Sequence, residues 1–180
     1  MNNTKPLLYF IALLWLIEII NTLLGHRLNT WGILPRQLAG LPGILLWPLL
    51  HGGFFHLISN TVPLLILGYL VSLRGAKNFV RLTLFITVIS GFGVWLFART
   101  AWHVGASGLI FGFFGYLLAR GWFERSLKSA AIALLVAVIY GGLIFGVLPQ
   151  DGQVSWEGHL FGLLAGVLAA RCLSDTLKRG

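Results

Sequence analysis

Residues 105–115 read Gly-Ala-Ser-Gly-Leu-Ile-Phe-Gly-Phe-Phe-Gly, so that a serine between glycines opens a long apolar run. Small residues recur within this run at Gly108, Gly112 and Gly115. Small residues about one helical turn apart let two helix backbones approach closely in lipid. A hydroxyl group at the mouth of such a span is costly to keep there without a function. The stretch predicts a closely packed membrane helix that carries a functional group, Ser107, in its first turn.

The composition of the chain indicates that lipid is part of its solvent. Of its 180 residues, 57% are hydrophobic and only 10% are charged, and the mean hydropathy is +0.87. A soluble domain of this length has too little interior to hide so much apolar surface. The single cysteine, Cys172, excludes an internal disulfide. We expect an all-α membrane protein whose single domain covers residues 1–180.

Six apolar segments of about 18 residues or longer match the thickness of a bilayer's hydrocarbon core. Proline and glycine mark breaks between them, as at residues 34–36, 74–75 and 148–152. The first segment lacks a small-residue cleavage site after it and is read as a retained span. The predicted spans of this six-helix bundle lie near residues 7–24, 54–73, 78–98, 106–122, 127–148 and 157–174.

The basic residues predict the orientation of these spans. With both termini in the cytoplasm, ten cations lie inside and only Arg27, Arg36 and Arg99 lie outside, which is a strong positive-inside bias. This placement explains the net charge of +8 without nucleic acid as a partner. It favours a multi-pass protein of the bacterial inner membrane. The ten cations are Lys5, Arg74, Lys77, Arg81, Arg120, Arg125, Lys128, Arg171, Lys178 and Arg179.

Three distant segments then place polar side chains in one layer near the outer surface. Spans two, four and six run from outside to inside, and each has its unusual residues in its first turns. They are His51, His56 and Asn60 at span two, Ser107 at span four and His159 at span six. This convergence predicts a site.

A serine hydroxyl becomes a nucleophile when a base takes its proton, and histidine is the usual base near neutral pH. Ser107 and His159 are therefore the candidate nucleophile and general base. Gly105 and Gly108 permit a tight turn and a close approach of backbone to substrate. Neither Glu157 nor Glu18 is placed as a third member, so the hypothesis is a dyad.

The candidate donors for an oxyanion come from two elements. The unpaired backbone amides of a helix's first turn, including that of Ser107, point outwards. His56 and Asn60 are four residues apart and share one face of span two. The segment 51–53, His-Gly-Gly, is suited to lining a small wet cavity that supplies water.

The glycines of the sixth span indicate how spans four and six meet. His159 is followed by Gly162 and Gly166, which match the glycine spacing after Ser107. This pairing brings the two spans together. It also predicts that Phe111 stacks on the imidazole of His159.

Other residues have a simple structural interpretation. His26 and His103 lie in loops and are expected at the surface. Arg120 and Glu124, one turn apart, are expected to form an interfacial ion pair of small value. An aromatic belt near the span ends accounts for Trp15, Trp31, Trp47, Trp95, Trp102, Trp122 and Trp156.

These residues resemble the motifs of the rhomboid intramembrane serine proteases. Residues 105–108 with Gly112 are similar to that family's fourth-span signature, and His159 with Gly162 and Gly166 to its sixth-span histidine and glycines. The histidine and asparagine pattern of span two, described above, also matches. The resemblance extends from about residue 51 to residue 170 in the same order.

The resemblance implies a six-helix core in which Ser107 attacks and His159 is the general base, without a cofactor or metal. His56, Asn60 and the Ser107 amide would form the oxyanion hole. The substrates would be single-pass transmembrane proteins. The chain departs from the family in lacking the common Trp-Arg dipeptide of the first loop, and in having Phe111 where a tyrosine is common.

The sequence also bears on three other functions. A small transporter would need polar residues that continue through the membrane, whereas the spans become apolar below their first turns. A non-catalytic relative that binds membrane helices is the alternative that stays open, although both Ser107 and His159 are retained. A zinc protease is disfavoured because no His-Glu-x-x-His motif is present.

Overall fold

The computed structural model describes residues 3–149 and 154–172. Within these ranges the secondary structure is helical, and the pairing of extended backbone is limited to one isolated antiparallel bridge, between Ile33 and His103. The expected end of the last span at residue 174 lies outside the described residues. So do the cations Lys178 and Arg179 and the predicted break at residues 150–152.

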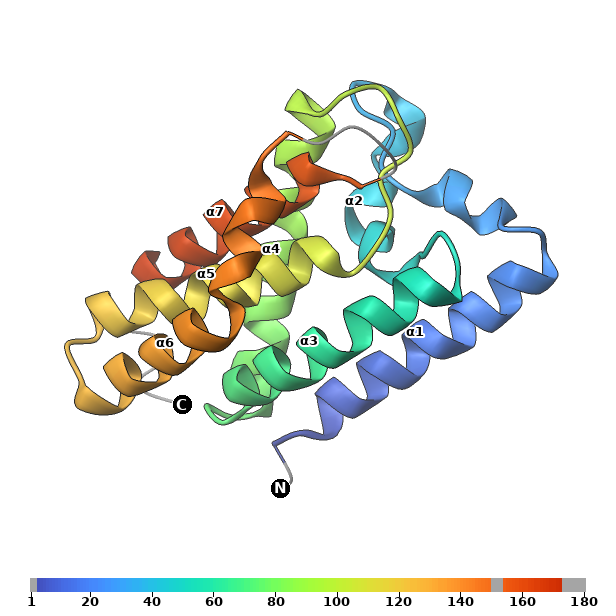
Figure 1. Ribbon diagram of the computed structural model, residues 1–180. Coiled ribbons are helices and arrows are strands. Elements are labelled where there is room, and N and C mark those ends of the chain that lie inside the picture. Colours follow the sequence, from blue (N-terminus) through green and yellow to red (C-terminus); the bar gives the residue numbers. More distant parts are fainter. Residues whose placement is uncertain (1–2, 150–153, 173–180) are drawn as a thin grey trace.

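Six long helices occupy the six segments that the sequence predicts, with ends that differ by a few residues (Figure 1). The fifth segment begins as a regular α-helix and continues as a 3-10 helix, η4, over Gly141–Val147. The α-helices are α1 Lys5–Leu23, α3 Phe54–Ser72, α4 Ala76–Phe97, α5 Ser107–Phe123, α6 Leu127–Tyr140 and α7 Trp156–Cys172.

Four of these segments are long and apolar enough to cross a membrane by themselves. They are α1, α3, α4 and α6 together with η4. The helices α5 and α7 have 17 residues each. At a rise of 1.5 Å per residue, α5 is about 26 Å long, slightly short of a typical 30 Å hydrocarbon core, and the described part of α7, which ends at Cys172, has the same length.

The segment between α1 and α3 folds into short helical turns. These are η1 Arg27–Trp31, η2 Leu38–Gly40, α2 Gly43–Leu46 and η3 Trp47–Leu49. They bring Trp47 beneath the start of α5, where its side chain is only 1% exposed. The assignment of Trp47 to an aromatic belt is therefore wrong, because its ring packs against the backbone at Gly108 and Gly158.

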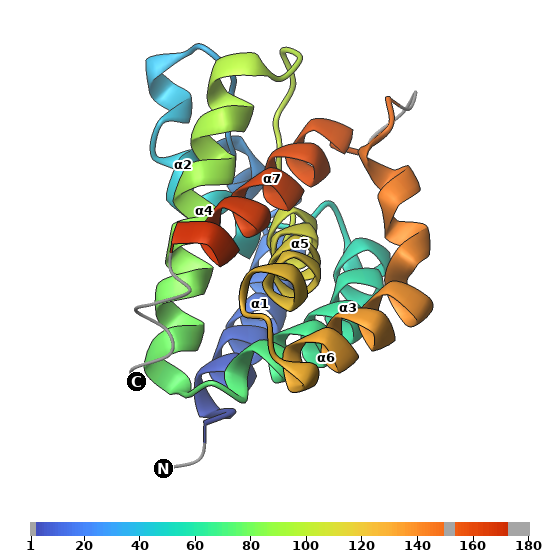
Figure 2. The same ribbon diagram turned by 90° about the vertical axis from the view of Figure 1, so that its left-hand side faces the viewer.

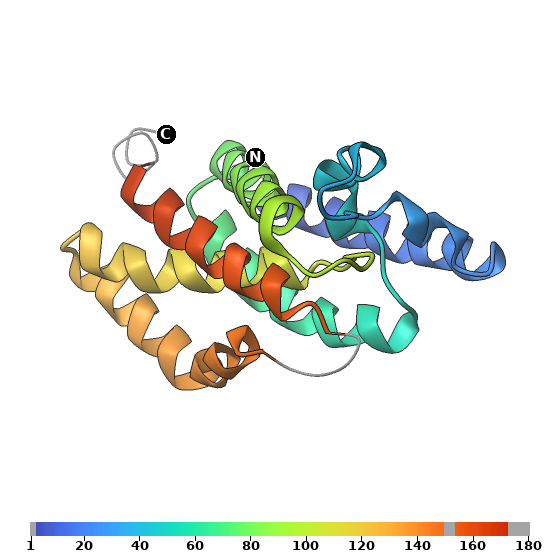
Figure 3. The same ribbon diagram turned by 90° about the horizontal axis from the view of Figure 1, so that it is seen from above.

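Helix α5 lies at the centre of the molecule, and Figure 2 views it nearly end-on with the other long helices around it. Residues 108–117 are all buried, as expected for a helix that is apolar on all sides. Its most extensive contact is with α7, which runs beside it in Figure 3. Gly162 faces the carbonyl of Gly108, and Gly166 faces the carbonyl of Gly112, so closely that a Cβ at either glycine of α7 would clash. The glycine pairing predicted from the sequence is confirmed.

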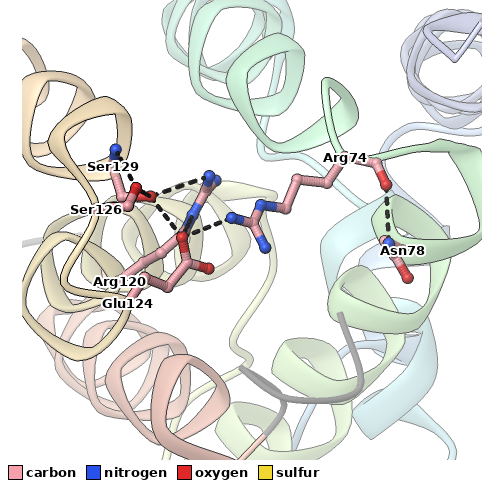
Figure 4. A network of polar contacts seen from close by, with 6 residues as sticks. All are labelled: Arg74, Asn78, Arg120, Glu124, Ser126 and Ser129. Carbon is pink, nitrogen blue, oxygen red and sulfur yellow. Dashed lines mark hydrogen bonds and ion pairs between the residues drawn. The ribbon is translucent and has the colours of Figure 1, made fainter. Parts of the chain in front are cut away.

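A buried polar network joins the far end of α5 to its neighbours (Figure 4). Glu124 accepts hydrogen bonds from Arg120 Nε at 2.9 Å, from Arg74 at 2.5 Å and from the Ser129 hydroxyl. The side chains of Arg120 and Glu124 are only 6% and 3% exposed. The ion pair expected from the sequence is present, but it is buried, because Arg74 and Ser129 cover it from the α3–α4 connection and from α6.

Candidate active site

A cavity of about 540 Å³ opens where α3, α5, η4 and α7 meet. It brings together the side chains of Ser107 and His159 with those of His56 and Asn60, which come from three different helices. Its other lining residues are Gly52, Phe55, Ser59, Pro63, Trp102, Val104, Ile110, Phe111, Leu143, Val154 and Ser155. A second cavity, of about 490 Å³ between α1, α3 and α6, has a lining of mainly aliphatic and aromatic residues.

The backbone before Ser107 is held from two sides. Gly105 has a φ of 123°, which favours glycine, and its N–H donates to the carbonyl of Trp47 at 2.8 Å. The N–H of Ala106 donates to His51 Nε2 at 3.4 Å. Ser107 is then the first residue of α5, so its amide belongs to the outward-pointing first turn. The local fold thus places Ser107 in the lining of the cavity, at the first turn of α5.

The imidazole of His159 is fixed in orientation by a carbonyl and a ring. Its Nδ1 lies 2.9 Å from the carbonyl oxygen of Gly146, so Nδ1–H is the donor and Nε2 is left as the acceptor. Phe111 stacks on it with ring centroids 4.1 Å apart and planes at 4°, which confirms the predicted stacking. Among the hydrogen bonds of the described residues, none joins Ser107 Oγ to this ring.

His56 and Asn60 lie against the turn that leads into Ser107. A Cβ at Gly105 would be 2.9 Å from His56 Nε2 and 3.8 Å from Asn60 Nδ2. His56 Nδ1 accepts from the Gly52 N–H at 3.4 Å, which places the proton on Nε2. Asn60 Nδ2 is buried without a hydrogen-bond partner. Two donors therefore converge beside Gly105, two residues before Ser107, and one of them has no protein acceptor.

His51 does not line the cavity but accepts a hydrogen bond from the backbone just before Ser107. Its side chain is 0% exposed, and of the segment 51–53 only Gly52 lines the cavity. Burial, followed by the neighbouring His56 ring at 5.1 Å, lowers the pKa of His51 to about 3. A neutral imidazole is what the hydrogen bond from Ala106 N–H requires. The carbonyl of His51 accepts hydrogen bonds from Asn21 and Asn29 at 3.3 and 3.0 Å.

Several residues around the site were not predicted from the sequence. His103, expected at the surface, is 2% exposed, because its backbone pairs with Ile33 at 3.0 and 2.9 Å. Gly146 contributes a carbonyl, which has no signature in a sequence. Asn21 is a polar residue inside the apolar first span, and that anomaly is a signal that points to it. No cluster of three potential metal ligands occurs among the described residues.

Comparison with known proteins shows the family to which the chain belongs. The family model for the rhomboid domain matches residues 38–176, which is most of the chain. An uncharacterized protein of Mycobacterium tuberculosis is 45% identical over 177 residues, covering 93% of this chain and 74% of that protein. An uncharacterized protein of Mycobacterium leprae is 40% identical and covers the same share of this chain and 70% of its own length. RHOMBOID-like protein 1 of Arabidopsis thaliana is 36% identical over 126 residues, 66% of this chain and 31% of that protein. The polar residues that carry the resemblance meet at the first turns of α3, α5 and α7. The extent of the family match therefore means that the protein belongs to the rhomboid family of integral membrane proteins.

Proposed function

We propose that the protein is a serine endopeptidase that hydrolyses peptide bonds in or near the transmembrane segments of other membrane proteins. The observation that carries the proposal is the shared cavity in which Ser107, His159 and two convergent hydrogen-bond donors meet. In this mechanism His159 Nε2 removes the hydroxyl proton of Ser107 as Oγ attacks the substrate carbonyl carbon. The hydrogen bond between a nucleophile and its general base is often long without substrate and shortens only in the substrate complex.

The remaining steps follow from the same two residues. The protonated His159 gives its proton to the leaving amine as the C–N bond breaks, which leaves an ester on Ser107. Water then loses a proton to His159 and attacks the ester, releasing the acid and restoring the Ser107 hydroxyl. The Gly146 carbonyl holds Nδ1–H throughout, a task that a carboxylate performs in catalytic triads. A third acidic residue is unnecessary.

The oxyanion hole of this mechanism consists of Asn60 Nδ2, His56 Nε2–H and the Ser107 amide. The support is the unpaired Asn60 donor, which costs free energy in the folded protein unless a ligand accepts from it. A developing negative charge on the substrate oxygen is such an acceptor. Donors fixed in place before the reaction stabilise that charge more than the neutral carbonyl, which lowers the barrier.

The setting of this reaction is also part of the proposal. Six spans, with both termini in the cytoplasm of a bacterium, place the cavity just below the outer surface of the inner membrane. The substrate is a single-pass protein whose span partly unwinds near its outer end, so that an extended backbone reaches Ser107. The cations at the α3–α4 and α5–α6 connections favour this orientation.

The test is cleavage of a single-span reporter in liposomes that contain the purified protein. Ser107→Ala and His159→Ala are expected to lower kcat at least ~10³-fold, because nucleophile and base act as a unit. A fluorophosphonate probe is expected to label the unaltered protein and to spare Ser107→Ala. Equal cleavage by all three proteins refutes the dyad. Capture of the reporter without cleavage by any of them favours the non-catalytic helix-binding alternative.

A further inference from the structure

A second serine–histidine contact lies beside the proposed dyad and has no role in the mechanism above. His103 Nδ1 lies 2.6 Å from Ser155 Oγ. His103 comes four residues before Ser107, and Ser155 comes four residues before His159. The contact therefore joins the two chain segments that lead into the nucleophile and the base.

The directions of the hydrogen bonds around this contact are determined. His103 Nε2 lies 3.0 Å from the carbonyl oxygen of Arg99, so Nε2–H donates and Nδ1 accepts. The Ser155 hydroxyl then donates to His103, while its oxygen accepts from the Gly158 N–H at 3.1 Å as the cap of α7. Both ring nitrogens of His103 and the hydroxyl of Ser155 are then satisfied, and no second arrangement satisfies all of them.

Neighbouring contacts make both segments stiff at this point. The backbone of His103 is paired with Ile33. The N–H of Arg99 donates to Glu157 Oε1 at 3.2 Å, and Arg99 Nη2 donates to the carbonyl of Val154 at 2.6 Å. The described charged groups that face His103 are therefore Arg99, from the α4–α5 connection, and Glu157, from α7.

These hydrogen bonds require a neutral His103 ring, and the surroundings of His103 favour the neutral form. Burial lowers the pKa of His103, while the hydrogen bond to the Arg99 carbonyl and the carboxylate of Glu157 partly oppose this effect. A neutral ring keeps Nδ1 as an acceptor for Ser155.

We propose that His103 and Ser155 are positioning residues whose hydrogen bond, here named the latch, sets the separation between Ser107 and His159. The proposal rests on the proposed protease function. Reaction rates depend steeply on such placement, because a displacement of about 1 Å at a reacting pair costs up to ~10²-fold. Ser155 lines the cavity, but neither residue of the latch is a reacting group in the mechanism above, and the latch acts through the two segments it joins.

Two substitutions of His103 separate the latch from packing. His103→Asn keeps an acceptor near the place of Nδ1, whereas His103→Gln keeps a polar group near the place of Nε2 and loses the bond to Ser155. Both leave the cap of α7 intact. Ser155→Thr retains a hydroxyl for the cap and the latch, and Ser155→Ala removes both.

The measurement is reporter cleavage in liposomes over a range of reporter concentrations. His103→Gln and Ser155→Ala are expected to lower kcat at least ~10-fold, with KM changed less than about twofold. The double variant is expected to lose no more than the worse single variant, because both remove one interaction. His103→Asn and Ser155→Thr are expected to recover most of kcat. Equal losses for Asn and Gln at His103, or additive losses in the double variant, overturn the latch.

Ser129→Ala is the matched control. Ser129 is a buried serine in a network of hydrogen bonds at the other end of α5, whereas Ser155 is partly buried. This variant is expected to unfold at a lower temperature and to keep its kcat when folded. If His103→Gln behaves as Ser129→Ala does, the bond serves stability alone and the proposal fails.

A second measurement decides the latch even if the reporter is not cleaved. The ¹⁵N resonances of the His159 ring report its surroundings in detergent-solubilised protein without any substrate. His103→Gln is expected to shift these resonances, and His103→Asn is expected to leave them close to those of the unaltered protein. Unchanged resonances in both variants refute the latch. By contrast, reporter cleavage that Ser107→Ala does not change refutes the proposed protease function, and the effect of the latch on the His159 resonances is independent of that outcome.

Discussion

At the scale of single residues, the buried donor of Asn60 is expected to lower the stability of the fold and to raise the activity. Asn60 is 6% exposed and its Nδ2 has no partner, so the folded protein bears the cost of desolvating it. Asn60→Leu is expected to raise the free energy of unfolding by about 1 kcal/mol. The same change is expected to lower kcat about 10²- to 10³-fold, as loss of an oxyanion donor does elsewhere. Thermal unfolding and reporter cleavage measure the two effects.

Asn78 is the matched control for this substitution. It is also a buried asparagine, at 5% exposure, but its Nδ2 donates to the carbonyl of Arg74 at 2.8 Å. Asn78→Leu is expected to lower the free energy of unfolding by about 1 kcal/mol and to leave kcat unchanged. A loss of stability in Asn60→Leu equal to that in Asn78→Leu contradicts the interpretation of Asn60 as an unpaired donor.

The residues that could be predicted from the sequence are those whose chemistry is anomalous where they occur. Ser107 and His159 stand out because polar groups are costly in apolar spans, and the stacking of Phe111 follows from helical spacing. His103 gave no such signal, because its burial depends on pairing with Ile33, a distant segment. The carbonyl of Gly146 could not be predicted at all, since every residue has one. The catalytic roles themselves stay predictions.

At the scale of helices, glycines determine how closely α5 and α7 pack. A Cβ at Gly162 would overlap the backbone of Gly108, with the Cα of Gly108 at 3.1 Å, and backbone atoms cannot rotate away. Gly162→Ala is expected to lower the free energy of unfolding by about 2 kcal/mol, although alanine favours helices by about 1 kcal/mol. It is also expected to lower kcat, because Gly162 lies one turn from His159.

Gly142 provides the comparison for this change. It lies in η4, and a Cβ there would meet nothing within 4 Å. Gly142→Ala is expected to leave stability unchanged or slightly higher, since it only restricts the unfolded chain. The measurement is thermal unfolding of both variants in one detergent. A Gly162→Ala protein as stable as Gly142→Ala would show that α5 and α7 can move apart at little cost in free energy.

The positions of the helices could be predicted because apolar runs end at recognisable breaks. The change from α6 to η4 was not predicted, and it coincides with Gly141, Gly142 and Gly146. Glycine weakens a regular helix by about 1 kcal/mol per residue, so neighbouring contacts decide the local form. One such contact is the hydrogen bond of His159 to Gly146, which a single-segment pattern does not contain.

At the scale of the whole molecule, the network around Glu124 joins the α3–α4 and α5–α6 connections far from the cavity. Burial alone raises the pKa of this carboxyl, but the hydrogen bonds from Ser129 and Arg120 and the charges of Arg120 and Arg74 outweigh it and hold the pKa below its ordinary value. The sequence showed only the local pair, because Arg74 lies 50 residues before Glu124.

This network predicts a dependence of stability on pH. A folded-state pKa below the unfolded value means that the unfolded chain binds a proton first as pH falls. The contribution of Glu124 is therefore complete above about pH 4.3 and is lost below it, as pH falls through the folded pKa. Glu124→Gln is expected to lower the free energy of unfolding by about 3 kcal/mol at neutral pH and to flatten this acid limb. Lys128→Gln, at an exposed position nearby, is expected to change neither; an acid limb unchanged in Glu124→Gln contradicts the assignment.

The proposed orientation of the whole protein can be tested through its single cysteine. Cys172 is exposed at the end of α7, and six spans with an inside N-terminus place it in the cytoplasm. A membrane-impermeant maleimide is expected to label it in inverted membrane vesicles and not in right-side-out spheroplasts. In a Cys172→Ser background, Lys77→Cys at the start of α4 is expected to behave as Cys172 does, and Arg27→Cys in η1 to show the opposite pattern.

The labelling pattern tests whether α7 crosses the membrane. The described part of α7, which ends at Cys172, is about 26 Å long, somewhat less than a typical hydrocarbon core of about 30 Å. If α7 did not cross, Cys172 would be labelled from the same side as Arg27→Cys, while Lys77→Cys would still mark the cytoplasm. That outcome would overturn the six-span topology. Labelling of Cys172 together with Lys77→Cys requires that α7, the helix that carries His159, crosses the membrane.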